Sequence, residues 1–83
     1  MTDDEIIAAV NKILEEDFEV DHSLLKPSAK LNEDVGLDSL DGVDLIVAIE
    51  ERFNYRIREE DARAMKTLQD IYDNIRRRIG SDV

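Results

Sequence analysis

The sequence lacks cysteine and tryptophan, and its 83 residues include one proline, one histidine, three glycines and 5% aromatic residues. Without cysteine the chain has no disulfide, no thiolate metal site and no thiol of its own to form a thioester. With 42% hydrophobic and 39% charged residues, this composition favours a small helical domain over a disordered chain or a β-sandwich. No apolar run approaches the ~18 residues of a membrane span, so we expect none.

The single histidine, His22, argues against an enzyme. A general base needs a nucleophile and an orienting partner within reach, and the residues around His22 supply neither. The sequence also has no glycine-rich loop of the kind that cradles phosphates. We therefore expect His22 to be an ordinary loop residue, and we expect the chain to catalyse no reaction.

The acidic residues do not follow the calcium-binding pattern of an EF-hand. A loop starting at Asp34 needs an acid or amide, a glycine and a glutamate at its third, sixth and twelfth positions. This chain has Gly36, Ser39 and Leu45 there. We expect no specific metal site, and loose binding of divalent cations by the acids of the second helix stays open as charge relief.

The net charge of −10 is unevenly distributed along the chain. Residues 1–51 contain 15 acids and 3 bases, residues 52–83 contain 6 acids and 8 bases, and residues 31–51 contain seven acids and no base. The negative electrostatic field of these acids argues against nucleic acid and anionic lipid as binding partners. It favours salt-sensitive association with basic protein surfaces. Because the N-terminus is acidic where a secretory signal is basic, we expect a cytoplasmic protein.

Apolar periodicity predicts one domain over residues 1–83, with an ordered core of about 3–79 and a short C-terminal tail. We expect a first helix at 3–16, a second at 39–53 that Asn54 ends, a short third at 59–64, and a last one at 68–79 that Thr67 caps and Gly80 ends. The long connection between the first two helices needs its own apolar anchors, and Leu24 lies in a short helical turn before Pro27. The candidate anchors are Phe18, Val20, Leu24, Leu25 and Leu31.

The second helix carries two separate apolar arcs and begins with a serine. A glycine turn, an acid and then a long apolar-periodic run predict that Ser39 lies at the helix N-terminus with its hydroxyl at the surface. At ~100° per residue, the arc that faces the core contains Gly42, Leu45, Ile46, Ile49 and Phe53. The other arc contains Leu40, Val43 and Val47, bordered by Asp44, Glu50 and Glu51. An exposed apolar stripe with an acidic border is typical of a docking surface.

The segment from Asp34 to Asp41 resembles the modification site of acyl carrier proteins, in which an Asp-Ser-Leu triplet follows a glycine-containing loop and opens the second helix. The triplet alone is a weak signal. The specific part is its continuation at helical spacing through Val43, Asp44, Leu45, Val47, Ile49, Glu50, Glu51 and Phe53. In length and helix spacing the resemblance covers the chain from about residue 6 to about residue 79.

The resemblance implies an all-α, small four-helix bundle of the acyl carrier type, with three longer helices and a short one. Ser39 would then carry 4′-phosphopantetheine, which a phosphopantetheinyl transferase takes from coenzyme A, and the thiol of that arm would hold acyl groups as thioesters. Asp38 would position the loop and join Asp41 and Asp44 in an acidic rim that meets basic surfaces of synthase enzymes. The residues implied to line an acyl pocket between the helices are Ile46, Ile49, Ile57, Met65 and Ile71.

Two features differ from the general carriers of bacterial fatty acid synthesis and leave the pathway open. Arg52, Arg56 and Arg58 are basic where such carriers tend to be acidic, and Gly42 places a glycine inside the helix. A carrier dedicated to a polyketide or a specialised lipid is the alternative. A peptidyl or aminoacyl carrier usually has Gly-His-Ser where this chain has Leu-Asp-Ser, so Asp38 argues against it. An unmodified acidic helical bundle that binds a partner helix is the alternative from another class. We expect the carrier to be a monomer.

Overall fold

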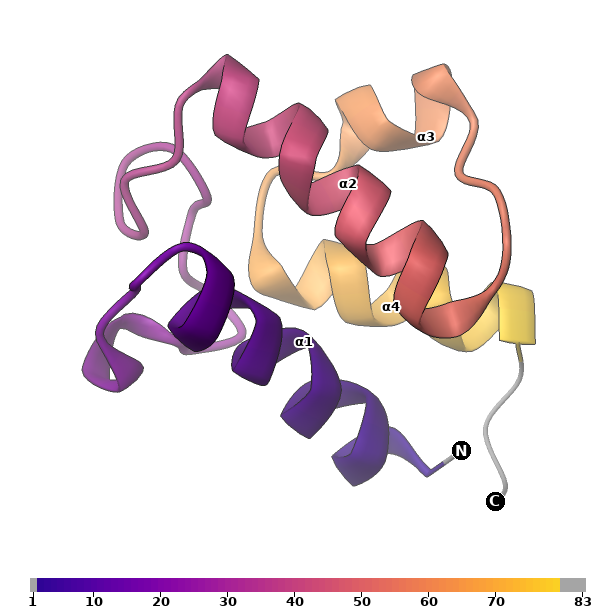
Figure 1. Cartoon of the computed structure of the whole chain (residues 1–83), viewed down its shortest axis with the longest axis horizontal. Helices are drawn as coiled ribbons and strands as arrows, with labels where there is room; N and C mark the ends of the chain where they lie inside the picture. Colours follow the sequence, from indigo (N-terminus) through magenta and orange to yellow (C-terminus); the bar gives the residue numbers. More distant parts are fainter. Residues whose placement is uncertain (1, 80–83) are drawn as a thin grey trace.

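The computed structural model describes residues 2–79, which form four α-helices and one turn of 3-10 helix (Figure 1). These elements are α1 (Asp3–Asp17), η1 (His22–Leu24), α2 (Ser39–Phe53), α3 (Glu59–Ala64) and α4 (Leu68–Ile79). Within the described residues there is no β-strand, and one isolated bridge pairs Lys30 with Thr67. The predicted all-α fold, with three longer helices and a short one, is confirmed; α1 ends one residue later than predicted.

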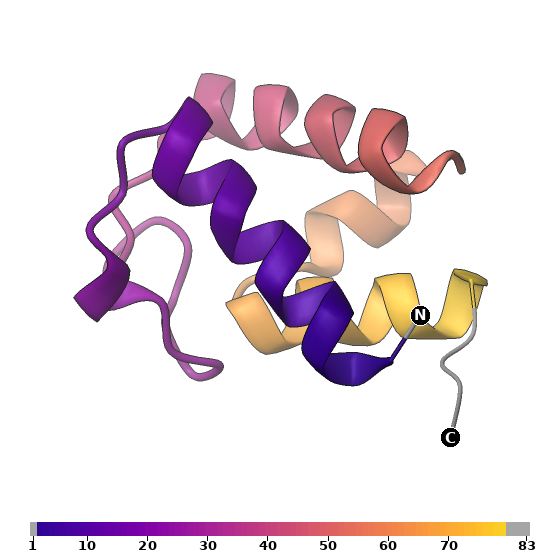
Figure 2. The ribbon, with the colours of Figure 1, turned by 60° about the horizontal axis from the view of Figure 1, so that its bottom comes forward.

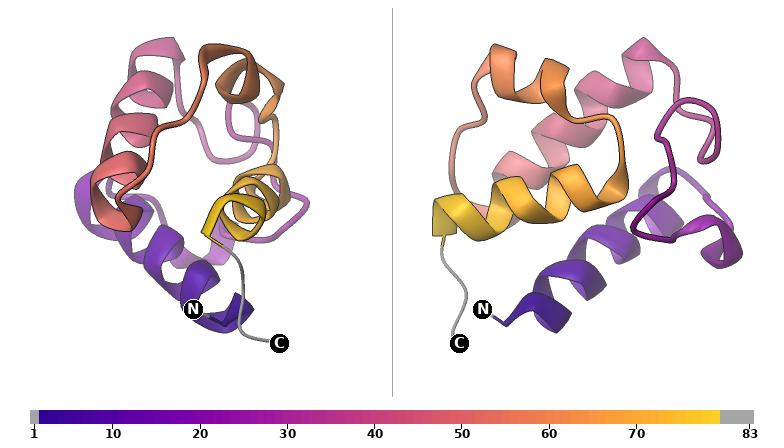
Figure 3. Two further views of the ribbon diagram at one scale, coloured as in Figure 1. Left: turned by 90° about the vertical axis from the view of Figure 1, so that its right-hand side faces the viewer. Right: turned by 180° about the vertical axis from the view of Figure 1, so that it is seen from behind.

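The core lies where α1, α2 and α4 meet. Helix α1 packs against both α4 and α2, and Figures 2 and 3 show α3 on the opposite side of the α2 and α4 pair from α1. The side chains with under 2% of their surface exposed are Ile6, Val10 and Leu14 of α1, Leu45 and Ile49 of α2, and Leu68, Ile71 and Ile75 of α4. The apolar residues that recur at helical spacing in these three helices therefore all face one shared core.

The long connection from α1 to α2 is held by backbone hydrogen bonds to the start of α4. The N–H of Leu68 donates to the carbonyl of Ala29 at 3.1 Å, and the N–H of Gln69 donates to the carbonyl of Pro27 at 2.9 Å. A helix leaves its first N–H groups without partners inside the helix, and here the loop accepts from them. The connection is thus fixed to α4, although it is long.

The predicted apolar anchors of this connection are confirmed except for one. Phe18, Val20, Leu25 and Leu31 are partly buried and pack against the core. Leu24 is wrong as an anchor, because 41% of its surface is exposed. It does lie in a short helical turn before Pro27, as predicted.

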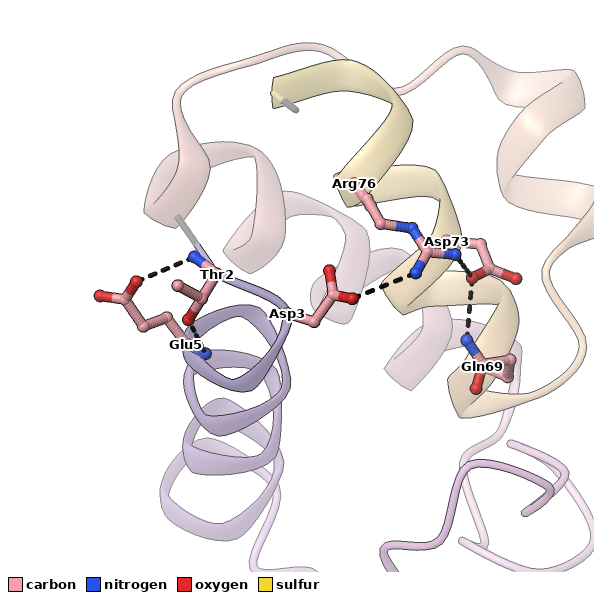
Figure 4. A network of polar contacts seen from close by, with 6 residues as sticks. All are labelled: Thr2, Asp3, Glu5, Gln69, Asp73 and Arg76. Atoms are coloured by element: carbon pink, nitrogen blue, oxygen red, sulfur yellow. Dashed lines mark hydrogen bonds and ion pairs between the residues drawn. The ribbon is translucent and has the colours of Figure 1, made fainter. Parts of the chain in front are cut away.

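Side-chain hydrogen bonds and backbone conformation define the helix ends. The Oγ1 of Thr2 accepts from the N–H of Glu5 at 3.2 Å, and the Oε1 of Glu5 accepts from the N–H of Thr2 at 2.9 Å (Figure 4). Asn54 has φ of 57° and ends α2 in the left-handed conformation, as predicted. The prediction that Gly80 ends the last helix lies outside the described residues.

A polar network joins the beginning of α1 to α4 (Figure 4). The guanidinium of Arg76 contacts Asp3 of α1 at 3.4 Å and Asp73 of its own helix at 2.6 Å. The amide of Gln69 donates to the same carboxylate of Asp73 at 2.8 Å. One of the three arginines at the end of α4 therefore links two helices.

None of the helices in residues 2–79 has the length and apolar character that crossing a membrane requires.

Candidate functional site

Ser39 is the first residue of α2, and its side chain is exposed. The turn before it depends on Gly36, whose φ of +87° is a conformation that other residues adopt only with strain. A Cβ built on Gly36 would meet no atom within 4 Å, so the requirement for glycine comes from the backbone angle alone. The glycine turn thus presents the serine at the surface, as the sequence predicted.

Asp38 caps α2, so the serine hydroxyl is not needed for that task. The Oδ1 of Asp38 accepts from the N–H of Asp41 at 2.8 Å, and the Oδ2 of Asp41 accepts from the N–H of Asp38 at 3.3 Å. The backbone carbonyl of Asp38 accepts from the N–H of Gly42 at 2.9 Å. Two of the predicted rim acids therefore also build the start of the helix.

The first two N–H groups of α2 remain available. Among residues 2–79, no group accepts a hydrogen bond from the backbone N–H of Ser39 or Leu40, and the hydroxyl of Ser39 forms no hydrogen bond. A helix N-terminus carries a partial positive charge and favours a negative group placed beside it. A phosphodiester on the Ser39 oxygen fits this position, because it is anionic and would lie against unpaired donors.

The second apolar arc of α2 lies in water. Leu40, Val43 and Val47 are exposed over 76%, 62% and 45% of their surfaces, while Leu45 and Ile49 on the other arc are at most 1% exposed. The prediction of a solvent-exposed apolar stripe on this helix is confirmed. Such side chains, one helical turn apart on one face, present a continuous surface on which a partner can pack.

The acids that border this stripe have different surroundings. Asp44 and Glu51 are exposed, whereas Glu50 is partly buried and its Oε2 accepts from the backbone N–H of Ile57 at 2.7 Å. This bond fastens the extended segment between α2 and α3 to the side of α2. Glu50 was predicted as part of a docking rim, and the structure gives it a bond within the fold that the sequence did not indicate.

A cavity of about 520 Å³ opens beside Ser39, between α2 and α3. Three of the predicted pocket residues line it, namely Ile46, Met65 and Ile71. Ile49 and Ile57 are not among the lining residues, since Ile49 lies fully in the core and Ile57 packs against it. The lining residues that the sequence did not indicate are Leu31, Gly42, Val43, Leu45, Glu59, Ala62, Arg63 and Lys66.

The glycine at position 42, inside α2, is the sequence feature that could have indicated this cavity. It follows Ser39 by three residues and so lies on the same side of the helix. A Cβ built at Gly42 would meet nothing within 4 Å, which shows that the space beside the helix is open at this point. The absence of a side chain one turn after the serine therefore widens the entrance to the cavity.

No group of three or more histidines, aspartates or glutamates in the described part of the chain is arranged to hold a metal ion. His22 lies in η1, where its Nδ1 is 2.8 Å from the Oε1 of Glu15; the His22 side chain is largely exposed, and that of Glu15 is partly buried.

Comparison with known proteins gives a consistent result. Residues 5–75 match the family described as "Phosphopantetheine attachment site". The acyl carrier protein of Thermosynechococcus vestitus is 38% identical over 98% of this chain and its own full length. That of Cyanidioschyzon merolae is 37% identical over 90% of this chain and 82% of its own, and acyl carrier protein 2 of Ralstonia nicotianae is 35% identical over 86% and 88%. The chain therefore belongs to the acyl carrier protein family, whose domain is the attachment site for phosphopantetheine.

Proposed function

We propose that the hydroxyl of Ser39 is the attachment point for 4′-phosphopantetheine, and that the chain carries acyl groups as thioesters on that arm. The observation that supports this assignment is the free hydroxyl of an exposed serine beside two unpaired N–H groups at the start of α2. Since Asp38 forms the cap, modification of Ser39 would break no hydrogen bond of the fold.

Coenzyme A would donate the arm, and a phosphopantetheinyl transferase would catalyse the step. The Ser39 oxygen would form a bond to the phosphorus next to the pantetheine, and the pyrophosphate P–O bond would break. Adenosine 3′,5′-bisphosphate would leave, and a base of the transferase would take the serine proton. The chain itself supplies the hydroxyl and the donors of α2, so it would act as a carrier and not as an enzyme.

The arm's thiol supplies the thioester chemistry that a chain without cysteine lacks. The residues of this chain would serve the cargo in two ways. The cavity beside Ser39 offers apolar walls from Ile46, Met65 and Ile71 to an acyl chain that folds back. The tether itself would keep the acyl group at high effective concentration near each enzyme that the carrier meets.

Partner enzymes would dock on the stripe formed by Leu40, Val43 and Val47. The exposure of these three residues supports this role, and the acidic field of residues 31–51 favours partners with basic surfaces. Asp44 and Glu51 are the acids free to meet such a partner, since Glu50 is bonded to the backbone of Ile57. The partners in this proposal are the transferase and the acyl-transferring and chain-elongating synthases.

We assign the cargo to fatty acid synthesis or to a related specialised lipid or polyketide pathway. Arg52, Arg56 and Arg58 are all exposed and give the far end of α2 a basic character that favours a dedicated carrier. Asp38 caps α2 in the position where a peptidyl or aminoacyl carrier usually has histidine, which is why that class ranks second. A cytoplasmic location and a monomeric state stay predictions.

The test is to incubate the purified chain with coenzyme A and a permissive transferase and to weigh the intact protein. We expect the mass of one phosphopantetheine to be added to the wild type and to Ser28→Ala, a matched control in an exposed loop. Ser39→Ala should gain nothing while it keeps the wild-type helical circular dichroism. If the wild type gains no mass, the chain is instead an unmodified interaction module that uses the same exposed stripe.

A further inference from the structure

Lys66 is far from Ser39 in the sequence, but both residues line the same two cavities. Lys66 lines the cavity of about 520 Å³ together with Ser39, and it lines with Ser39 a second, adjoining cavity of about 320 Å³. Leu31, Gly42 and Met65 are common to both. Ser39 and Lys66 therefore border the same hollow surface from two sides, one from α2 and one from the segment between α3 and α4.

The backbone of Lys66 is fixed in this position. Its N–H donates to the Oδ2 of Asp70 at 2.8 Å, and its carbonyl accepts from the N–H of Leu31 at 2.9 Å. The side chain is exposed and takes part in neither bond. A lysine of this kind places a mobile ammonium group on a rigid base, so it can reach a nearby anion without any change in the fold.

The other cations near this surface already have partners. Arg63, which lines the larger cavity, pairs with Glu59 one turn earlier in α3, and Lys30 pairs with Glu33 at 3.5 Å. Among residues 2–79 the ammonium group of Lys66 forms no ion pair. Asp38 lines the smaller cavity and Glu59 the larger one, but neither carboxylate pairs with Lys66 in the described fold, so its ammonium group is available to a further anion.

We infer that Lys66 is a positioning residue that contacts the phosphodiester on Ser39 and draws the arm toward the cavity between α2 and α3. This inference rests on the proposed attachment at Ser39. A phosphodiester carries one negative charge and exposed oxygens, and an ammonium group forms a charge-assisted hydrogen bond with such a group. The unpaired N–H groups of Ser39 and Leu40 would hold one side of the phosphate, and Lys66 the other.

The test compares the chain before and after attachment of phosphopantetheine. Each form is treated with a limiting amine-acetylating reagent at low salt, and the acetylation rate of every lysine is read by peptide mass spectrometry. We expect attachment to slow acetylation of Lys66 by about twofold or more, the range of an exposed ion pair. Lys12 on α1, which is exposed and pairs with Glu16, is the internal control and should react at the same rate in both forms.

A second readout observes the phosphorus directly. The ³¹P resonance of the modified chain should move in Lys66→Gln and stay in place in Lys12→Gln, which removes the same charge from a distant helix. Equal Lys66 rates in the two forms, together with an unmoved ³¹P signal in Lys66→Gln, would overturn the inference and leave the attachment at Ser39 intact. Failure of the wild type to accept the arm at all would instead overturn the proposed function.

Discussion

Helices α2 and α4 begin with the same local structure but differ in what lies beyond it. Each starts after a capping residue, Asp38 or Thr67, whose side chain accepts from the N–H of an aspartate three residues later. At α4 the first two N–H groups, those of Leu68 and Gln69, donate to carbonyls of the connection between α1 and α2. At α2 no described residue accepts from the first two N–H groups. The two helix starts therefore share the same kind of cap and differ in their first two N–H groups, which among the described residues are bonded at α4 and unbonded at α2.

The apolar residues in the first turn of the two helices show the same difference. Leu68 at the start of α4 is fully buried, and Leu40 at the start of α2 is 76% exposed. The start of α4 is therefore part of the core, and the start of α2 is exposed to solvent. We propose that the start of α4 serves the fold and that the start of α2 serves the carrier function, and the variants below test this difference.

The largest effect should come from truncating the two leucines. Leu68→Ala removes a fully buried side chain and should lower the free energy of unfolding by about 2–5 kcal/mol. Leu40→Ala should change it by less than about 0.5 kcal/mol, as exposed substitutions do, while weakening binding to a partner synthase. Urea denaturation measures both changes. Similar losses in the two variants would show that the start of α2 is part of the core after all.

The next effect concerns the glycine turn in front of Ser39. Gly36→Ala forces a side chain onto a residue with φ of +87° and should cost about 1–3 kcal/mol of stability. Gly42→Ala is the matched control, because its Cβ meets nothing and alanine favours a helix interior by about 0.5–1 kcal/mol. Thermal unfolding of the two variants should therefore shift in opposite directions. A stable Gly36→Ala would contradict the role given to this turn.

A smaller and equal loss of stability should follow removal of either cap. Asp38→Ala and Thr67→Ala should each cost about 1 kcal/mol in the free energy of unfolding. Only Asp38→Ala should also slow attachment of phosphopantetheine, because only that cap holds the donors beside Ser39. Asp38→Asn keeps the cap and should restore both properties to near wild type. If Thr67→Ala slows attachment as much, the two helix starts are not separate in function.

The smallest expected effect is a pH dependence of the free energy of unfolding that arises from Asp70 in α4. Hydrogen bonds from the backbone of Lys66 and Thr67 lower the pKa of Asp70 below its ordinary value of 3.8. A carboxyl group with a lowered pKa in the folded state adds stability above its unfolded pKa and loses it as the pH falls through the folded value. The urea midpoint of the wild type should thus fall as the pH drops below about 4. In Asp70→Asn this fall should be shallower, and an unchanged profile would contradict the assignment.

The sequence predicted the helices and the exposed position of Ser39 at the start of α2 well because their signals are local. Apolar periodicity and caps such as Asn54 and Thr67 act within one or two turns, and the Gly36 turn directly precedes Ser39. What the sequence did not indicate depends on contacts between distant residues. The hydrogen bond from the Ile57 N–H to Glu50, the exposure of Leu24 and the cavity shared by Lys66 and Ser39 all arise when separate elements pack together.

The most direct test of the account is to locate the modification. The chain is loaded with phosphopantetheine and digested, and the fragment masses show which residue bears the arm. We predict that it lies on Ser39 alone, and that Ser23, Ser28 and Ser81 stay unmodified. An arm found on any other serine, or a folded chain that every transferase leaves unmodified, would contradict the claim that the open start of α2 is the carrier site.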